Sequence, residues 1–217
     1  MPNNKATPLN IRPMRGTLYR FAPVSPYPAT LNLTGNVRAA NILARLLQSK
    51  SPPNLKGLPP LIQQALLCPM GPWASPMRSP GDPGLILGAA HLHTAVNACA
   101  QRQQQFLNSM PPHPNVPYLH SMHTLYSVTY NTPHGVSLRA IELPPEQTHT
   151  IAKILRGHNV AVATYPAADP LDEPDIGVLT ANALEGCEIQ YEGTWVSEVS
   201  CEGATTTTCM PGLRVQP

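Results

Sequence analysis

The 217-residue chain has few aromatic and few charged side chains. Aromatic residues make up 5% of the sequence and charged residues 12%, with only two Phe and two Trp. This charged fraction is about half of the usual value for soluble domains. We therefore expect a core of Leu, Val, Ile and Ala. A surface so poor in charge indicates either coverage by partners or a neutral coat of Thr, Asn, Gln and Ser.

Long apolar runs are missing, and cysteine is sparse. No segment approaches the roughly 20 apolar residues of a membrane-spanning helix, so no membrane association is expected. The polar start MPNNKATPLN does not resemble a secretory signal, which predicts a protein that is not secreted. Five cysteines without a C-x-x-C pair predict free thiols in a reducing compartment. We expect an intracellular, cytoplasmic location or a place in a virion.

Phosphate-binding and catalytic signatures are also missing. The sequence contains no G-x-x-x-x-G-K-[ST], no G-x-G-x-x-G and no G-x-S-x-G. These absences argue against the commonest NTPases, dinucleotide-dependent enzymes and α/β-hydrolases. We therefore expect a protein that is not an enzyme, with no catalytic residue and no cofactor.

The eight histidines do not predict a metal site. His91 and His93 lie two apart in an expected helix, and His120 and His123 lie three apart in an expected strand. In both cases the two side chains should point to different sides. A histidine-based site within residues 113–134, where strands of a hairpin would bring further histidines together, is the least favoured alternative. A metal ligand set is not expected.

One acidic cluster lies in a proline-rich loop near residue 170. Its spacing does not match that of a calcium-binding loop, so we expect a solvated acidic loop, with a divalent-cation bridge between subunits as the alternative. The cluster consists of Asp169, Asp172, Glu173 and Asp175.

Charge is distributed very unevenly along the chain. Residues 1–141 hold eleven Lys/Arg and one acid, Asp82, which gives 11 − 1 = +10. Residues 142–217 hold three bases and eleven acids, which gives 3 − 11 = −8. Such asymmetry predicts a basic part that meets a polyanion or an acidic partner, and an acidic part that faces elsewhere.

Proline marks the N-terminal part. Fifteen of the 27 prolines fall within residues 1–83, and each removes an amide donor and favours extended backbone before it. Residues 1–31 are therefore predicted to form an extended basic arm. Residues 32–112 are predicted to be helical, with helices after Asn36, after Pro59 and over 83–109, the last capped by Asp82. A proline-rich linker is expected at 69–82.

Residues 113–217 are predicted to form an acidic domain rich in antiparallel strands. The segment 118–143 reads as a hairpin that turns at NTPHG, and 187–201 as a second hairpin that turns at Glu192-Gly193. A helix is expected from Pro145 to Gly157, with strands near 159–165 and 176–181. The segment 204–217 is expected to form a last edge strand or an extended arm. The fold class is α+β, with a distorted jelly roll as the alternative.

These features together favour a structural protein that assembles. We expect a small viral coat or virion-associated subunit whose basic N-terminal part contacts RNA or neighbouring subunits, so self-association and nucleic-acid binding are predicted. An acidic protein is the other expected partner. The residues predicted to make these contacts are Lys5, Arg12, Arg15, Arg20, Arg38 and Arg45.

Two other function classes stay open from the sequence. The first is a regulatory or accessory protein whose proline-rich segments bind partner domains. The second is the histidine-dependent enzyme described above. Protease sensitivity of the N-terminal part separates the first from an assembly subunit, and metal analysis addresses the second.

Overall fold

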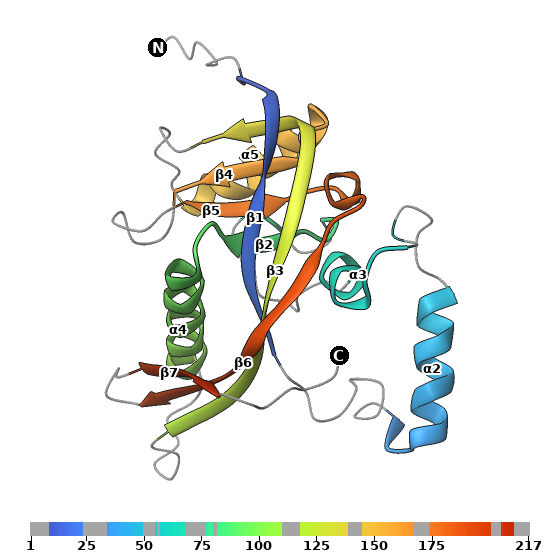
Figure 1. Ribbon diagram of the computed structural model, residues 1–217, viewed down its shortest axis with the longest axis vertical. Helices are drawn as coiled ribbons and strands as arrows, with labels where there is room; N and C mark the ends of the chain where they lie inside the picture. The colour runs from blue at the N-terminus through green and yellow to red at the C-terminus, as the bar shows by residue number, and fades with distance from the viewer. Residues whose placement is uncertain are drawn as a thin grey trace.

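The fold is a closed barrel whose sheet continues beyond it into an extension (Figure 1). The computed structural model describes residues 9–23, 34–49, 55, 57–67, 77–79, 82–109, 118–138, 145–166, 174–200 and 205–210. Its seven strands lie in the order β1-β2-β5-β4-β3-β6-β7, and a further pairing of β1 with β3 closes the first five into a barrel. The strands are β1 Arg12–Pro23, β2 Ile86–Ala89, β3 Tyr118–Ser137, β4 Val162–Tyr165, β5 Asp175–Val178, β6 Ile189–Ser200 and β7 Thr205–Met210.

Helices surround the barrel on several sides. Figure 1 shows α4 beside the barrel and above β7, α5 behind the upper strands, and α2 standing apart from the rest of the molecule. A short 3₁₀ turn, η2, follows β5. The helical elements are α2 Val37–Ser49, α3 Pro60–Leu67, α4 Leu92–Ser109, α5 Pro145–Gly157 and η2 Ala181–Leu184.

The barrel interior is filled by side chains from all five of its strands. Successive side chains of a strand point to opposite faces, so every second residue of each strand faces inward. Ile62 of α3 and Leu184 of η2 join this interior cluster and are fully buried. The strand residues of the cluster include Leu18, Ile86, Val128, Val162 and Val178.

Two smaller clusters attach helices to the outside of the barrel. Ala152 and Leu155 of α5 pack in one cluster with barrel residues such as Ala163. Ala95 and Cys99 of α4 pack in another with residues of β1, β2 and β3. Both helices thus bury one apolar stripe against the sheet, as amphipathic helices do.

The predicted N-terminal arm needs a correction. Residues 12–23 form β1, which pairs with β3 along nearly its whole length and closes the barrel. The two prolines of this stretch lie where a strand tolerates them: Pro13 at a register irregularity between Arg12 and Met14, and Pro23 at the end. Between these two prolines the side chains point alternately inward and outward, and no further proline interrupts the strand. Residues 1–8 and 24–33 lie outside the described residues.

The predicted helix over 83–109 is also wrong in its first part. Residues 86–89 form the buried strand β2, and α4 begins only at Leu92. Asp82 does not cap a helix, since its carboxylate accepts a hydrogen bond of 2.8 Å from the Ser79 amide in a turn. A short apolar run can form either a buried strand or part of a helix, and here the run forms a strand because it pairs with its neighbours in the sheet.

Both predicted hairpins are continuous strands instead. β3 runs through NTPHG over 20 residues, and β6 runs through Glu192-Gly193 over 12. The Thr132 hydroxyl accepts a hydrogen bond from the His134 amide where β3 bends, and Gly193 has a φ of 138°. The glycine lies at a register shift between β6 and β3. The turn-like residues therefore bend the strands without reversing them.

Other predictions are confirmed. Asn36 caps α2, since its Oδ1 accepts hydrogen bonds from the amides of Arg38 (2.8 Å) and Ala39 (3.3 Å). The helices near 60 and 145, the short strands β4 and β5 and the edge strand β7 are present as expected. The fold is a mixture of helix and sheet, built on a closed barrel in place of a jelly roll. Its sheet takes strands from all three predicted regions.

Candidate interaction surfaces

A three-stranded extension of the sheet projects beyond the barrel. We call it the extension sheet and define it as residues 118–124 of β3, 194–200 of β6, and β7. His120 pairs with Glu198 across β3 and β6, and Thr194 pairs with Met210 across β6 and β7. Helix α4 covers one face of this sheet (Figure 1), and we call the face that carries the exposed His120, Met122 and Glu198 the open face.

The covered face holds an aromatic cluster around Phe21. The rings of Trp195 and His123 meet Phe21 edge to face, with centroids 5.7 and 6.1 Å away. His123 is buried, and its Nε2 lies 3.0 Å from the Gln103 amide nitrogen and 2.9 Å from the Ser121 hydroxyl. Because an amide nitrogen can only donate, Nε2 acts as acceptor, which places the ring proton on Nδ1. The cluster fixes α4 on the sheet.

The buried His123 makes stability depend on pH. Burial lowers its pKa, and the charge of Arg102 lowers it further, so the ring stays neutral in the folded protein while the unfolded chain still protonates near 6.5. The folded state therefore loses stability as pH falls from about 6.5 towards the lowered pKa, at up to about 1.4 kcal/mol per pH unit.

We expect His123→Gln to flatten this slope in denaturant titrations between pH 7 and 5. The exposed His120→Gln serves as control, and an unchanged slope in His123→Gln contradicts the account.

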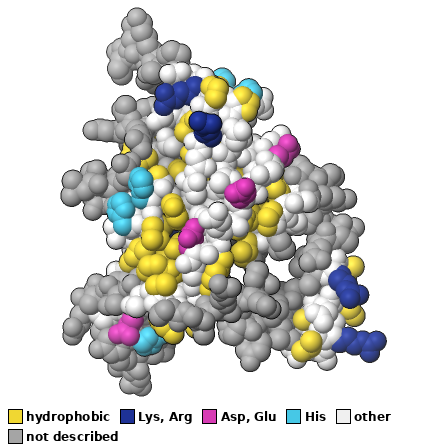
Figure 2. All heavy atoms as spheres, viewed as in Figure 1, with side chains coloured by type: hydrophobic (Ala, Val, Ile, Leu, Met, Phe, Trp, Pro, Cys, Tyr) yellow, Lys and Arg dark blue, Asp and Glu magenta, His cyan; other side chains and the backbone are white. Residues whose placement is uncertain are grey.

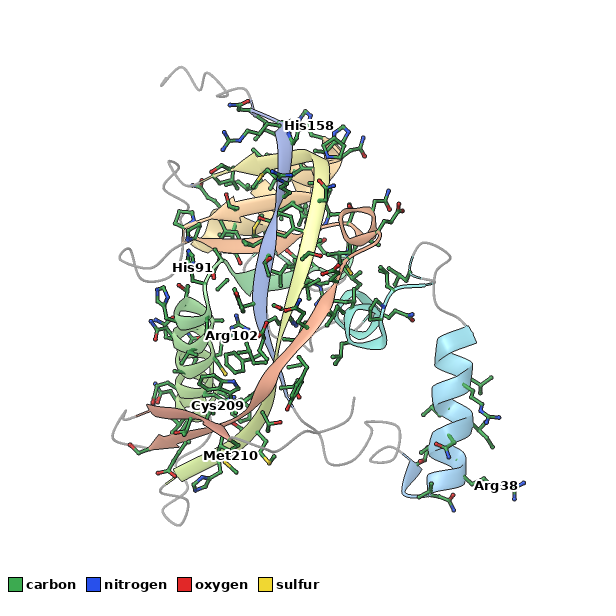
Figure 3. The ribbon with its side chains drawn as sticks, viewed as in Figure 1. Arg38, His91, Arg102, His158, Cys209 and Met210 are labelled. Atoms are coloured by element: carbon green, nitrogen blue, oxygen red, sulfur yellow. The ribbon has the colours of Figure 1, made fainter. Side chains whose placement is uncertain are left out.

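The free edge of the extension sheet carries no charge. β7 has the sequence TTTTCM, and among the described residues no strand pairs with its outer edge. Cys209 and Met210 lie on β7 at the lower end of the molecule (Figure 3). Met210 is 41% exposed, and Met122 of β3 is 38% exposed. Natural edge strands usually avoid pairing through charge, proline or bulges, and the described part of this edge has none.

The basic residues predicted to bind RNA or partners fall into different places. Arg12 and Arg15 are exposed on β1, and Arg38 and Arg45 are exposed on α2. Figure 2 shows Lys and Arg side chains in two separate groups, one at the upper end and one over α2. These four arginines therefore do not form one continuous surface. Lys5 lies outside the described residues.

Arg20 belongs to the interior of the barrel. It pairs with Tyr126 across β1 and β3, so both side chains lie on the inward face, and its Nη1 donates a 2.7 Å hydrogen bond to the Leu87 carbonyl. Burial lowers the pKa of Arg20 and raises that of Tyr126. The inward alternation of β1 explains this position. Arg20 is thus half-buried with its guanidinium bound inside the barrel, apart from the exposed arginines.

The histidine pairs only partly follow the sequence prediction. His91 and His93 do not point apart, since their rings stack with centroids 5.9 Å apart. The reason is that α4 begins between them, at Leu92. His120 and His123 do face opposite sides, with His120 on the open face, 3.5 Å from a Glu198 oxygen. Within the described ranges, no group of three or more His, Cys, Asp or Glu side chains could hold a metal ion.

Several predicted features cannot be placed. Asp169, Asp172, Glu173 and His113 lie outside the described residues, as does the greater part of the 69–82 linker. Cys99, Cys187 and Cys209 are free thiols. None of the described helices is long and apolar enough to cross a membrane.

No known protein family or curated protein matches the chain. The function of the protein therefore has to be inferred from the geometry of its surfaces and cavities. The sequence left 204–217 open between an edge strand and an extended arm, and it did not single out Met122 or Met210. The signal in the sequence was the uncharged run TTTT. This run indicates a contact surface only when β7 is known to lie at the edge of the sheet.

Proposed function

We propose that this protein is a structural subunit that assembles with copies of itself through the outer edge of β7. The observation that carries the proposal is the uncharged edge of the extension sheet, with which none of the described strands pairs. A free edge presents a row of backbone donors and acceptors that a second strand can satisfy. A second copy offers an identical strand of the same length and chemistry.

Two β7 strands related by a two-fold axis would pair antiparallel. Such an interface is isologous, because the same residues contribute from both copies. The pairing would join the two extension sheets into one continuous sheet through backbone hydrogen bonds between the two edges. The exposed side chain of Met210 lies on this edge strand and would add apolar contact.

The exposed arginines suit a second kind of contact. Arg12 and Arg15 on β1, and Arg38 and Arg45 on α2, are exposed away from β7, so they stay accessible when the edges pair. In the dimer each of them is present twice, which supports binding to RNA or to the acidic side of a neighbour. A small viral coat or virion-associated subunit is the class of protein that fits both properties, and we retain it as the proposed class.

A charge on the edge strand tests the proposal. Thr208 is exposed on β7, and a lysine there would oppose its counterpart across the two-fold axis. We expect Thr208→Lys to shift the protein towards monomer in size-exclusion chromatography with light scattering. Gln190→Lys, which adds the same charge at an exposed site of β6 away from the edge, should leave the mass unchanged. The A260/A280 ratio of the same peak reports bound nucleic acid. Association of Thr208→Lys equal to that of the unmodified protein would refute the role of β7.

A further inference from the structure

A large cavity opens at the end of the barrel where β3 bends. Its volume is about 910 Å³, and it lies between the bend of β3, the C-terminal end of α5, the segment after β5 and the residues that precede β2. Its apolar wall includes Leu66, Pro133, Leu179 and Ala181. Ligand sites commonly have this composition, mostly apolar with a few polar groups that converge.

Two arginines give the cavity its charge. Arg78 is 5% exposed, and its Nε donates a 3.3 Å hydrogen bond to the backbone carbonyl of Asp82. Arg156 reaches the cavity from the last turn of α5, where its Nη2 donates to the Pro83 carbonyl at 3.4 Å. Asp82 is the one carboxylate of the lining, so the arginines and Asp82 together carry 2 − 1 = +1.

The positive charge of the cavity is not balanced internally. The Asp82 carboxylate already accepts the Ser79 amide, which holds its pKa below the usual value. No ion pair joins Asp82 to Arg78 or Arg156, all three of which are described residues. Burial lowers the pKa of Arg156, the charge of Asp82 opposes this effect, and the charge of Arg78 adds to it. The two arginines therefore repel each other in a partly dry site.

Arg156 also has unused donors. Its Nε and Nη1 are buried and have no hydrogen-bond partner. A position near the C-terminal end of α5 favours a positive charge, but it leaves these two nitrogens unsatisfied. Buried donors without partners cost free energy, and each one in a native protein calls for an explanation. An oxyanion in the adjoining cavity would supply the missing acceptor.

The backbone beside Arg78 is strained. Met77 has a φ of 64°, in the left-handed region that residues other than glycine rarely adopt. Asn159, which lines the cavity, has a φ of 56°, but it follows the end of α5, where asparagine is common in this conformation. Met77 lies in a turn, and none of the described helices ends there. Strain of this kind is often found where a neighbouring side chain must be held for function.

We propose that this cavity binds an organic oxyanion, with a phosphate or carboxylate group between Arg78 and Arg156 and an apolar body against Leu66, Pro133 and Leu179. Guanidinium groups match both oxyanions in geometry and charge. The proposal is independent of self-association through β7, which lies on the extension sheet. A monomeric protein can therefore bind the ligand.

Titration calorimetry of the full chain tests the site with four probes. Phenyl phosphate and phenylacetate carry the two oxyanions on one ring, inorganic phosphate lacks the ring, and benzyl alcohol lacks the charge. We expect saturable binding of at least one of the two ring oxyanions, tighter than inorganic phosphate and benzyl alcohol. The ring oxyanion that binds with the higher affinity shows whether the site prefers phosphate or carboxylate. Failure of both to saturate at millimolar concentration overturns the proposal, as does equal binding of benzyl alcohol.

Three variants assign the binding to the arginines. Arg156→Gln should weaken it at least about tenfold, because a charge-assisted hydrogen bond is lost. Asp82→Asn should tighten it several-fold, because the competing carboxylate disappears, and a purely structural role would not give this gain. Arg102→Gln removes an equal charge from exposed α4, outside the cavity lining, and should leave the affinity unchanged. Circular dichroism confirms that each variant is folded. Unchanged affinity in both Arg156→Gln and Asp82→Asn overturns the assignment.

Discussion

Leu18→Ala is expected to lower the free energy of unfolding by about 2–5 kcal/mol, the range for a large-to-small change in a packed core. Leu18 is completely buried in the barrel interior, on the strand that closes the barrel. For a chain of this length the loss corresponds to a fall in Tm on the order of 10 °C. Denaturant titration or differential scanning calorimetry measures it directly.

The control for Leu18→Ala lies three residues earlier on the same strand. Arg15 is exposed, so Arg15→Gln should change stability by no more than about 0.5 kcal/mol. If residues 12–23 were an arm outside the fold, both variants would melt like the unmodified protein. That outcome would contradict the closed barrel.

Gly84→Ala is expected to destabilise the protein by about 1–3 kcal/mol or more, the cost of forcing an extra carbon into a packed site. A Cβ at this position would overlap the backbone carbonyl of Leu66, at the end of α3. Backbone cannot move aside as a side-chain end can, so α3 or the start of β2 must shift. Because Ile62 of α3 fills the barrel interior, the shift would disturb the core.

Gly157→Ala is the matched control for this substitution. Gly157 ends α5, and a Cβ there would meet no atom within 4 Å. Its replacement should leave stability unchanged or raise it by up to about 1 kcal/mol. Equal melting temperatures for Gly84→Ala and Gly157→Ala would show that α3 does not approach Gly84 as closely as the structure places it.

Local signals in the sequence predicted the elements that depend on local chemistry. Asn36 as a cap and Pro145 at the first turn of α5 gave correct helix starts, because capping acts within a few residues. The apolar run at Leu85–Leu87 was assigned to a helix, since only the neighbouring strands of the barrel show that β2 fills a place in the sheet. Residues that resemble turns, such as those near Pro133, bend β3 without reversing it, because β1 pairs with β3 before and after Pro133 and β4 pairs with it from Gly135.

The sequence was least informative about where charges lie in space. The sequence pattern places Arg20 with the arginines of an extended arm, and only pairing of β1 with β3 turns its side chain inward. Arg78 and Arg156 are 78 residues apart in sequence, and no motif links them; the end of the barrel brings them to one cavity. Charge counts along the chain could therefore predict a basic N-terminal part, but they could not predict a site.

Self-association is tested most directly by the molar mass of the purified, unmodified protein, measured by light scattering over a dilution series. Pairing of β7 edges predicts a mass at high concentration that is a multiple of the monomer, falls towards the monomer on dilution, and is lowered by Thr208→Lys but not by Gln190→Lys. A monomer at every concentration, at both low and physiological salt, would contradict assembly through β7.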